Sequence, residues 1–260
     1  MLVRRVEDVL ELLEFYAEFQ KPATISEVSQ HFGWPRSSTF NILTTMSSRG
    51  YLYESGGKGQ YYPTSRLFRV AQSINAGAPL PDAVISLLDE LAEDTEETVF
   101  LAAPSGLQAV FLEVRQSPHR VRYFADVGGQ IPLFATATGQ AILSQLPERH
   151  VDSILRRVRF ERYGPGTPMS IDEVMRSIRQ SLRRGYFVSA SNYSQDLGGV
   201  SVPLVIDGRA YAITVAGPLS RFEPRQLDYV KLLHDRVPAY LGTDFFSDSV
   251  KGLKPLATTE

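Results

Sequence analysis

The first 65 residues constrain the fold most, because short helical patterns there are each closed by glycine or proline. Apolar residues recur at helical spacing over residues 6–17, and Lys21-Pro22 ends that pattern. A second helix is expected to begin at Ser26, whose hydroxyl can cap its first turn, and to end before Gly33.

A third helix and a hairpin follow directly. Pro35 suits the start of a helix, because its missing amide costs nothing there, and the helix is expected to run to about Arg49. Residues 51–53 and 60–62 have the composition of strands and enclose a glycine-rich, basic tip. Three helices followed by such a hairpin predict a winged helix-turn-helix domain over residues 1–65.

The third helix carries side chains that suit contact with DNA. Arginine and asparagine can bind guanine and adenine bidentately, and short hydroxyls reach phosphate oxygens. The alternative is that the hydroxyls only cap the helix, and that the lysine in the hairpin tip belongs to a plain flexible turn. The candidate DNA-binding residues are Arg36, Ser37, Ser38, Thr39, Asn41 and Lys58.

Composition predicts a cytoplasmic protein without a membrane partner. No apolar run approaches the roughly 18 residues that span a bilayer, and the start of the chain lacks a signal-peptide core. The absence of cysteine excludes disulfides and thiolate metal sites. The net charge of -2 hides an asymmetry, since residues 33–66 carry four basic residues and one acidic residue, whereas residues 1–32 carry three basic and six acidic.

A second domain is expected beyond the break at residues 77–81. The predicted organisation is a DNA-binding domain at 1–65, a linker helix at 66–80, a second domain at 81–245 and a loosely ordered tail at 246–260. Strands are predicted at 98–103, 108–114, 121–125, 186–190, 199–206 and 209–216. Helices are predicted around 84–91 and at 137–146, 148–157, 170–184 and 224–241.

The segment from Phe124 to Gln140 has the ingredients of a small-molecule pocket. Phe124 and Phe134 offer apolar walls, and residues 136–139 present backbone amides at the start of a helix, where a carboxylate is favoured. The equally weighted alternative is that Thr136 or Thr138 only caps that helix.

The sequence predicts neither an enzyme nor a metal site or cofactor. The four histidines are scattered, and neither a nucleophile elbow nor a phosphate-cradling loop is present. The arginines between Arg156 and Arg162 are interpreted as a solvated helix face rather than a nucleic-acid patch.

The sequence resembles the IclR-type bacterial transcriptional regulators over nearly its whole length. The matching stretches are residues 6–13, 25–29, 33–39, 59–64, 131–141 and 214–218, with Leu67 and Arg221. The resemblance implies an α+β protein in which a winged helix-turn-helix domain precedes a GAF-like α/β effector-binding domain. It also implies operator binding as a homodimer or homotetramer under the control of a small organic effector.

The resemblance places the effector pocket between the helix start at Thr136 and facing strands that carry Ser189, Gly199 and Ala216. Family members often have Asp, Cys and Ser at these last three positions, so this pocket is expected to be roomier and less polar. An apolar carboxylate, aromatic or fatty, fits such a pocket better than a small polar acid such as glyoxylate. The residues expected to bound it are Phe124, Phe134, Thr136, Ala137, Ser189, Val200, Thr214 and Ala216.

The sequence therefore predicts a DNA-binding transcriptional regulator controlled by a small organic acid. Two alternatives stay open: a sensor or enzyme whose winged helix contacts proteins, and a winged-helix regulator without a ligand.

Overall fold

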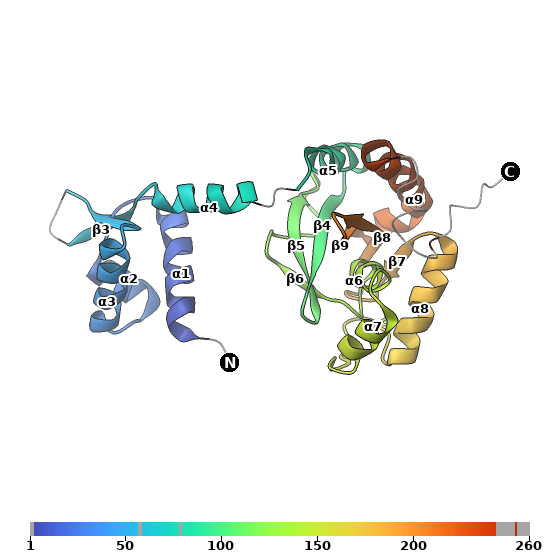
Figure 1. Ribbon diagram of the computed structural model, residues 1–260, viewed down its shortest axis with the longest axis horizontal. Helices are drawn as coiled ribbons and strands as arrows, with labels where there is room; N and C mark the ends of the chain where they lie inside the picture. The colour runs from blue at the N-terminus through green and yellow to red at the C-terminus, as the bar shows by residue number, and fades with distance from the viewer. Residues whose placement is uncertain (1–2, 57–58, 78–79, 243–252, 254–260) are drawn as a thin grey trace. The chain divides into compact units, whose positions relative to one another are not determined.

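The computed structural model of the chain describes residues 3–56, 59–77, 80–242 and 253. The chain divides into two compact units, Met1–Pro79 (unit 1) and Leu80–Glu260 (unit 2) (Figure 1). Lys58 and most of the expected tail lie outside the described residues. Leu253 is the described residue of that tail, and it is buried in the core of unit 2.

Unit 1 is a helical bundle with a small antiparallel sheet. Its helices are α1 (Arg4–Phe19), α2 (Ile25–Phe32), α3 (Arg36–Ser48) and α4 (Arg66–Gly77), and its strands are β1 (Ala23–Thr24), β2 (Leu52–Glu54) and β3 (Gln60–Pro63). The strands lie in the order β1-β3-β2, so the predicted hairpin gains a short third strand that sequence patterns did not indicate. Leu12, Val28 and Leu43 are fully buried where α1, α2 and α3 meet.

The start of α2 differs from the prediction. Thr24, rather than Ser26, is the N-cap, because its hydroxyl accepts from the amide of Glu27 at 3.2 Å. The Glu27 carboxylate in turn accepts from the Thr24 amide at 2.7 Å and from the Thr24 hydroxyl at 2.8 Å, and these two hydrogen bonds to the carboxylate lower the pKa of Glu27. A reciprocal pair of this kind satisfies two amides that a helix end leaves free.

Unit 2 is built on a six-stranded antiparallel sheet in the order β6-β5-β4-β9-β8-β7. The strands are β4 (Thr98–Ser105), β5 (Gln108–Arg115), β6 (Gln130–Pro132), β7 (Phe187–Ala190), β8 (Leu197–Ile206) and β9 (Arg209–Pro218). The helices are α5 (Asp82–Thr95), α6 (Ala137–Leu143), α7 (Glu148–Leu155), α8 (Ile171–Arg184) and α9 (Leu219–Leu241).

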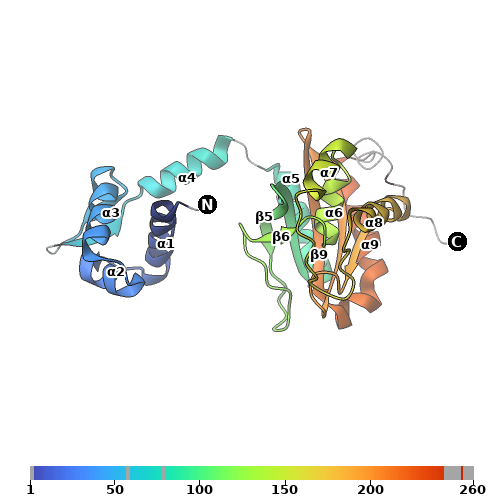
Figure 2. The ribbon, with the colours of Figure 1, turned by 90° about the horizontal axis from the view of Figure 1, so that it is seen from below.

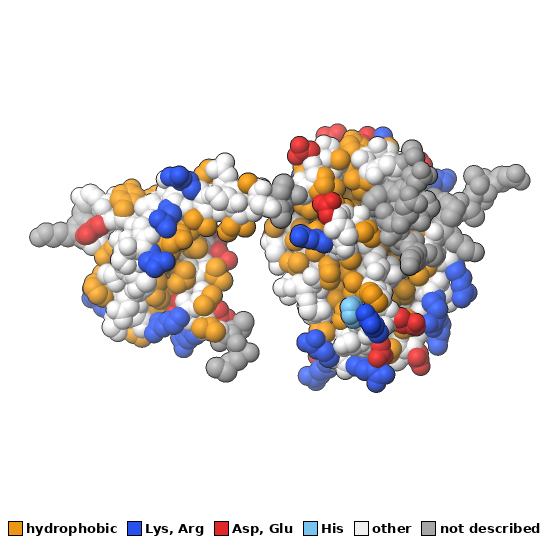
Figure 3. Space-filling view, viewed as in Figure 1, with side chains coloured by type: hydrophobic (Ala, Val, Ile, Leu, Met, Phe, Trp, Pro, Cys, Tyr) orange, Lys and Arg blue, Asp and Glu red, His pale blue; other side chains and the backbone are white. Residues whose placement is uncertain are grey.

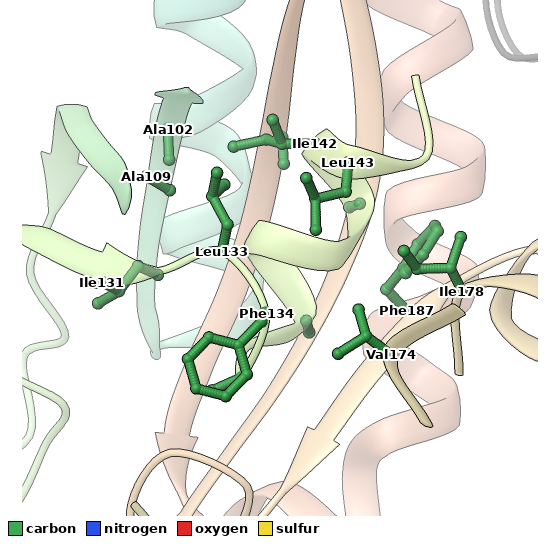
Figure 4. Packing of buried hydrophobic residues seen from close by; sticks show 14 of the residues in the cluster. Ala102, Ala109, Ile131, Leu133, Phe134, Ile142, Leu143, Val174, Ile178 and Phe187 are labelled. Atoms are coloured by element: carbon green, nitrogen blue, oxygen red, sulfur yellow. The ribbon is translucent and has the colours of Figure 1, made fainter. Parts of the chain in front are cut away.

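The sheet is covered on both faces, which gives unit 2 two separate cores (Figures 1 and 2). One core lies beneath α5 and α9 and includes Leu88, Val200 and Leu233. The other lies beneath α6, α7 and α8, and Figure 4 shows its side chains Ile142 and Val174 between these helices and the sheet. Both faces of each central strand are therefore largely apolar.

The expected strand at residues 121–125 is absent from the structure. The segment 116–127, here called the strap, crosses beside β4 without joining the sheet. Side chains rather than strand partners bind its carbonyls: Thr98 donates to the Tyr123 carbonyl at 2.6 Å, and Arg221 donates to that of Val121 at 3.0 Å. The prediction was wrong because alternating apolar residues here do not alternate between core and solvent.

We predict that Thr24→Ala destabilises unit 1 by about 1 kcal/mol, because it removes the N-cap of α2. Urea unfolding followed by the fluorescence of Trp34, the single tryptophan of the chain, reports on unit 1. Ser26→Ala is the matched control and should change stability by less than half as much. A larger loss for Ser26→Ala than for Thr24→Ala would contradict the assignment of the cap.

Candidate DNA interface and effector cavity

Helix α3 presents one polar face to solvent while its other face fills the core of unit 1. Ile42, Leu43 and Met46 are buried against α1 and α2. Arg36, Ser37, Ser38 and Asn41 lie outside this core, as a role in DNA binding requires. The helix therefore has the division between core and solvent that a recognition helix needs.

Thr39 does not belong to this exposed face. Its side chain is fully buried, and its hydroxyl donates to the Pro35 carbonyl at 3.2 Å. The sequence-based prediction for Thr39 was wrong, because the side chain turns inward at the fourth position of the helix. Its hydroxyl secures the first turn of α3 and cannot reach DNA.

Arg36 is held at the start of α3 by a neighbouring helix. Its guanidinium donates to the Ser26 hydroxyl at 3.0 Å, which orients the exposed side chain without neutralising its charge. Arg5 of α1 donates to the Ser38 hydroxyl at 3.3 Å and adds a second cation beside α3.

Phe40 was missed by sequence reasoning, although it is 49% exposed on the α3 face between the polar candidates. An exposed phenylalanine on this face can contact the methyl group of thymine. Its apolar character made it look like a core residue, and only its position relative to Ile42 and Leu43 in the helix could have distinguished it.

A small cavity in unit 2 lies between the start of α6, the strap and the strands β7, β8 and β9. Its volume is about 30 Å³, room for about two water molecules. The lining residues are Phe100, Tyr123, Ile131, Thr136, Ala137, Thr138, Ser189, Tyr193, Leu197, Gly198, Gly199, Thr214 and Ala216. None of the described charged side chains lines it, so the cavity is apolar apart from hydroxyl groups and backbone.

Five of the eight residues expected at the effector pocket line this cavity, namely Thr136, Ala137, Ser189, Thr214 and Ala216. Val200 does not, because successive side chains of β8 point to opposite faces and Val200 belongs to the core beneath α5 and α9. Phe124 is 62% exposed on the strap. Phe134 is buried nearby, but it packs on Phe160 and Tyr163 instead.

Two small residues of paired strands form part of the cavity wall. Gly199 of β8 lies opposite Ala216 of β9. A Cβ atom added at Gly199 would meet the Ala216 Cβ at 3.6 Å, an ordinary contact, whereas one added at the adjacent Gly198 would lie 2.2 Å from the Phe222 ring. Gly198 therefore serves packing, and Gly199 leaves space in the cavity.

The hydroxyl groups at the cavity wall donate their protons to one another and to backbone carbonyls. Thr214 donates to Ser201 at 2.9 Å, and Ser201 donates to the Ile213 carbonyl at 3.1 Å. The 2.8 Å contact between Thr138 and Thr214 must then use the Thr138 proton. Thr136 similarly donates to the Pro132 carbonyl, so these threonines offer lone pairs and not protons to a ligand.

Three other hydroxyls have no hydrogen-bond partner among the described residues: those of Tyr123, Tyr193 and Ser189. Burial raises the pKa of the Tyr123 phenol, which keeps its proton available for donation. Both tyrosines were missed from the sequence, because Tyr123 lies in a segment that was wrongly predicted to be a strand and Tyr193 lies between predicted strands.

An ion pair with a buried carboxylate holds the strap that carries Tyr123. Glu97 is 1% exposed, and Arg221 donates to its two carboxylate oxygens at 2.6 and 2.9 Å. This interaction raises the pKa of Arg221, and the same guanidinium binds the Val121 carbonyl. The ion pair thus connects α9, the bend just before β4 and the strap at the edge of the cavity.

The described part of the chain offers neither a cluster of metal ligands nor a membrane-spanning helix. No group of three or more potential ligands there could hold a metal ion. Within the same ranges no helix is both long enough and apolar enough to cross a membrane.

Comparison with known families and proteins matches both units. The IclR helix-turn-helix domain matches residues 6–56, and the bacterial transcriptional regulator IclR C-terminal domain matches residues 77–237. The acetate operon repressor of Salmonella typhimurium is 32% identical over 216 residues, which are 82% of this chain and 79% of that protein. The transcriptional repressor IclR of Escherichia coli is 30% identical with the same coverage.

Solved structures share the fold. The Thermotoga maritima IclR structure covers 92% of this chain and 99% of its own, with a TM-score of 0.74 at 20% identity. An IclR homologue from Microbacterium hydrocarbonoxydans, complexed with 4-hydroxybenzoate, covers 94% and 99% with a TM-score of 0.69 at 22% identity.

The two units define a DNA-binding transcriptional regulator with a separate effector-binding domain, and not an enzyme. The chain belongs to the IclR family of bacterial transcriptional regulators.

We predict that Arg36→Ala weakens binding to the operator by about 1–3 kcal/mol, while binding to random DNA changes much less. The reason is the loss of a charged bidentate donor at the start of α3. Competition titrations with both duplexes at fixed salt measure the difference. Equal losses on the two duplexes would show that Arg36 contacts only phosphates.

Proposed function

We propose that the cavity of unit 2 binds a small carboxylic acid with an apolar body, and that this ligand controls operator binding by unit 1. The residues that line the cavity support this proposal. Phe100, Ile131 and Leu197 offer apolar surface, and the unpaired hydroxyl groups described above can donate hydrogen bonds. Burial of the ligand's apolar surface contributes roughly 25 cal/mol per Å². The 4-hydroxybenzoate complex of a homologue with this fold supports an aromatic acid as one example of the class.

Uncharged donors must hold the carboxylate, because no described cationic side chain lines the cavity. Tyr123 and Tyr193 come from separate segments and both line the cavity, so each can donate to a carboxylate there. Ser189 lies on the adjoining strand β7 and can complete the set. Hydrogen bonds from neutral donors to a charged acceptor contribute about 1.5–3 kcal/mol each.

The cavity must enlarge to admit such a ligand, because about 30 Å³ is too small for an aromatic ring. The sheet and α6 are closely packed, whereas Tyr123 and Tyr193 lie in irregular segments. The Tyr193 ring also packs at a tilt against that of Tyr163, with centroids 5.5 Å apart, so a displacement of Tyr193 would disturb the segment 160–167. Outward movement of these tyrosines is our proposed first step of the effector response.

We predict that benzoate and 4-hydroxybenzoate raise the melting temperature of unit 2, whereas glyoxylate and pyruvate do so weakly. Ala216→Leu should abolish the response to the aromatic acids, since the added side chain fills the cavity beside Gly199. Thermal unfolding and operator titration, each with and without the acids, measure both effects. Operator binding without effector should remain within about twofold of the parent.

Val200→Ala is the matched control, since it alters the opposite core one residue away from Gly199. It should lower stability but keep the response to effector. A normal response in Ala216→Leu would show that the ligand binds elsewhere, and loss of operator binding in that variant would show general damage. A parent that responds to no acid in the panel would contradict the proposed class of effector.

We also propose that the regulator acts as a dimer through unit 1. Helix α4 has no buried residue, and Phe68 and Ile74 are 69% and 72% exposed. Val6 and Leu10 of α1 are likewise exposed. A second copy of the chain is the proposed occupant of these surfaces, because paired half-sites extend the DNA sequence that a single winged helix reads.

We predict a mass of at least a dimer in light scattering at micromolar concentration. Phe68→Glu with Ile74→Glu should shift the protein toward the monomer and weaken operator binding more than tenfold. Arg69→Glu, on the same helix, is the control and should remain associated. A monomeric parent would contradict the dimer.

A further inference from the structure

Exposed arginines cover α7, the segment after it and α8. Seven of them have no ion pair among the described residues. One of the seven, Arg184, donates to the Tyr186 carbonyl instead. We call the other six the arginine surface: Arg149, Arg157, Arg162, Arg176, Arg179 and Arg183. Figure 3 shows Lys and Arg side chains gathered over these elements at the lower rim of unit 2.

Positive and negative charge are separated along the sequence of unit 2. Residues 148–184 carry nine arginines and five acidic residues, a net charge of +4. The remaining residues, 80–147 and 185–260, carry ten basic and seventeen acidic residues, a net charge of −7. A fold that only needed a solvated surface would not require this separation, so the positive region suggests an anionic partner.

The acidic residues within the positive region are mostly engaged. Asp152 pairs with Arg156 at 2.6 Å, and Glu161 lies 3.5 Å from Arg159. The Glu173 carboxylate accepts from the Met169 amide at 2.7 Å. The remaining two, Glu148 and Asp172, lie in the first turns of α7 and α8, where the helix dipole favours a negative charge.

The geometry does not support the interpretation of the arginines after Arg156 as a solvated helix face. Helix α7 ends at Leu155, so Arg157 and Arg162 do not follow helical spacing. On α8, in contrast, Arg176, Arg179 and Arg183 recur every three or four residues and share one side of the helix. They form a row about 10 Å long at 1.5 Å per residue.

Arg162 and Arg176 also line one polar hollow, about 460 Å³ in volume, beside α8. Gln180 and Asn192 contribute amide groups to it, and Glu173, whose carboxylate accepts from the Met169 amide, also lines it. A row of cations next to a polar hollow suits a regular series of phosphates better than a single small anion. Every cation in residues 148–184 is arginine, whose guanidinium binds phosphate oxygens bidentately.

We propose that the arginine surface contacts the phosphate backbone of DNA that flanks the operator. Unit 2 is covalently joined to the DNA-binding unit, so flanking phosphates are present at high effective concentration whenever the operator is bound. The contact is independent of base sequence. It adds affinity and salt dependence, and the choice of operator remains with α3.

The test compares two triple variants of the full chain that change net charge equally. Arg176→Gln, Arg179→Gln and Arg183→Gln neutralise the row on α8. Arg120→Gln, Arg209→Gln and Lys231→Gln neutralise exposed cations of unit 2 outside the surface. Both are titrated by fluorescence anisotropy, over a range of salt, against an operator selected from random DNA, either alone or with 20 bp on each side.

The parent and the control should bind the flanked duplex severalfold more tightly than the bare operator, with a steeper dependence on salt. The α8 variant should lose this gain, its slope falling by about 0.9 for each phosphate contact removed, while binding to the bare operator stays the same. Equal binding of both duplexes by the parent, or equal slopes for the two variants, would overturn the proposal. Loss of self-association in the α8 variant, without a change in slope, would instead assign the surface to contacts between copies.

Discussion

Unit 2 depends on a sheet that is buried on both faces. Each central strand therefore supplies side chains to two cores, one that must be filled and one that must leave space for a cavity. On β8, Val200 fills the core beneath α5 and α9, while Gly199 faces the cavity beside α6. A shift of one residue in register would place Val200 in the cavity and remove the space for a ligand. The pairing of Gly199 with Ala216 therefore fixes both the packing and the site.

The same sheet anchors the segment that closes the cavity. Burying a carboxylate costs several kcal/mol unless it is paired, and Glu97 is paired bidentately with Arg221. The guanidinium has a further donor, which binds the strap at Val121, and Thr98 binds the strap again at Tyr123. An effector that displaced Tyr123 would strain these hydrogen bonds, which connect the cavity to the start of α9.

Local signals allowed much of the fold to be predicted. An Asp-Gly pair between two strand patterns indicates a two-residue hairpin turn. Asp207 and Gly208 indeed take the positive φ, at 50° and 72°, that such a turn requires. The side of an element that a residue faces was harder, since Thr39 and Val200 each lie within a correctly predicted element but point into a core. The role of Tyr123 could not be predicted, because its place is set by side-chain contacts from distant residues.

Under the proposed function, a ligand bound in unit 2 changes the affinity of unit 1 for DNA. Linkage requires the effect to be reciprocal, so the most direct measurement is calorimetric titration of the tightest-binding acid into the regulator, free and saturated with operator. We expect operator to change the Kd of the acid by the same factor by which the acid changes the Kd of operator. An acid Kd that is identical with and without operator would contradict control through this cavity.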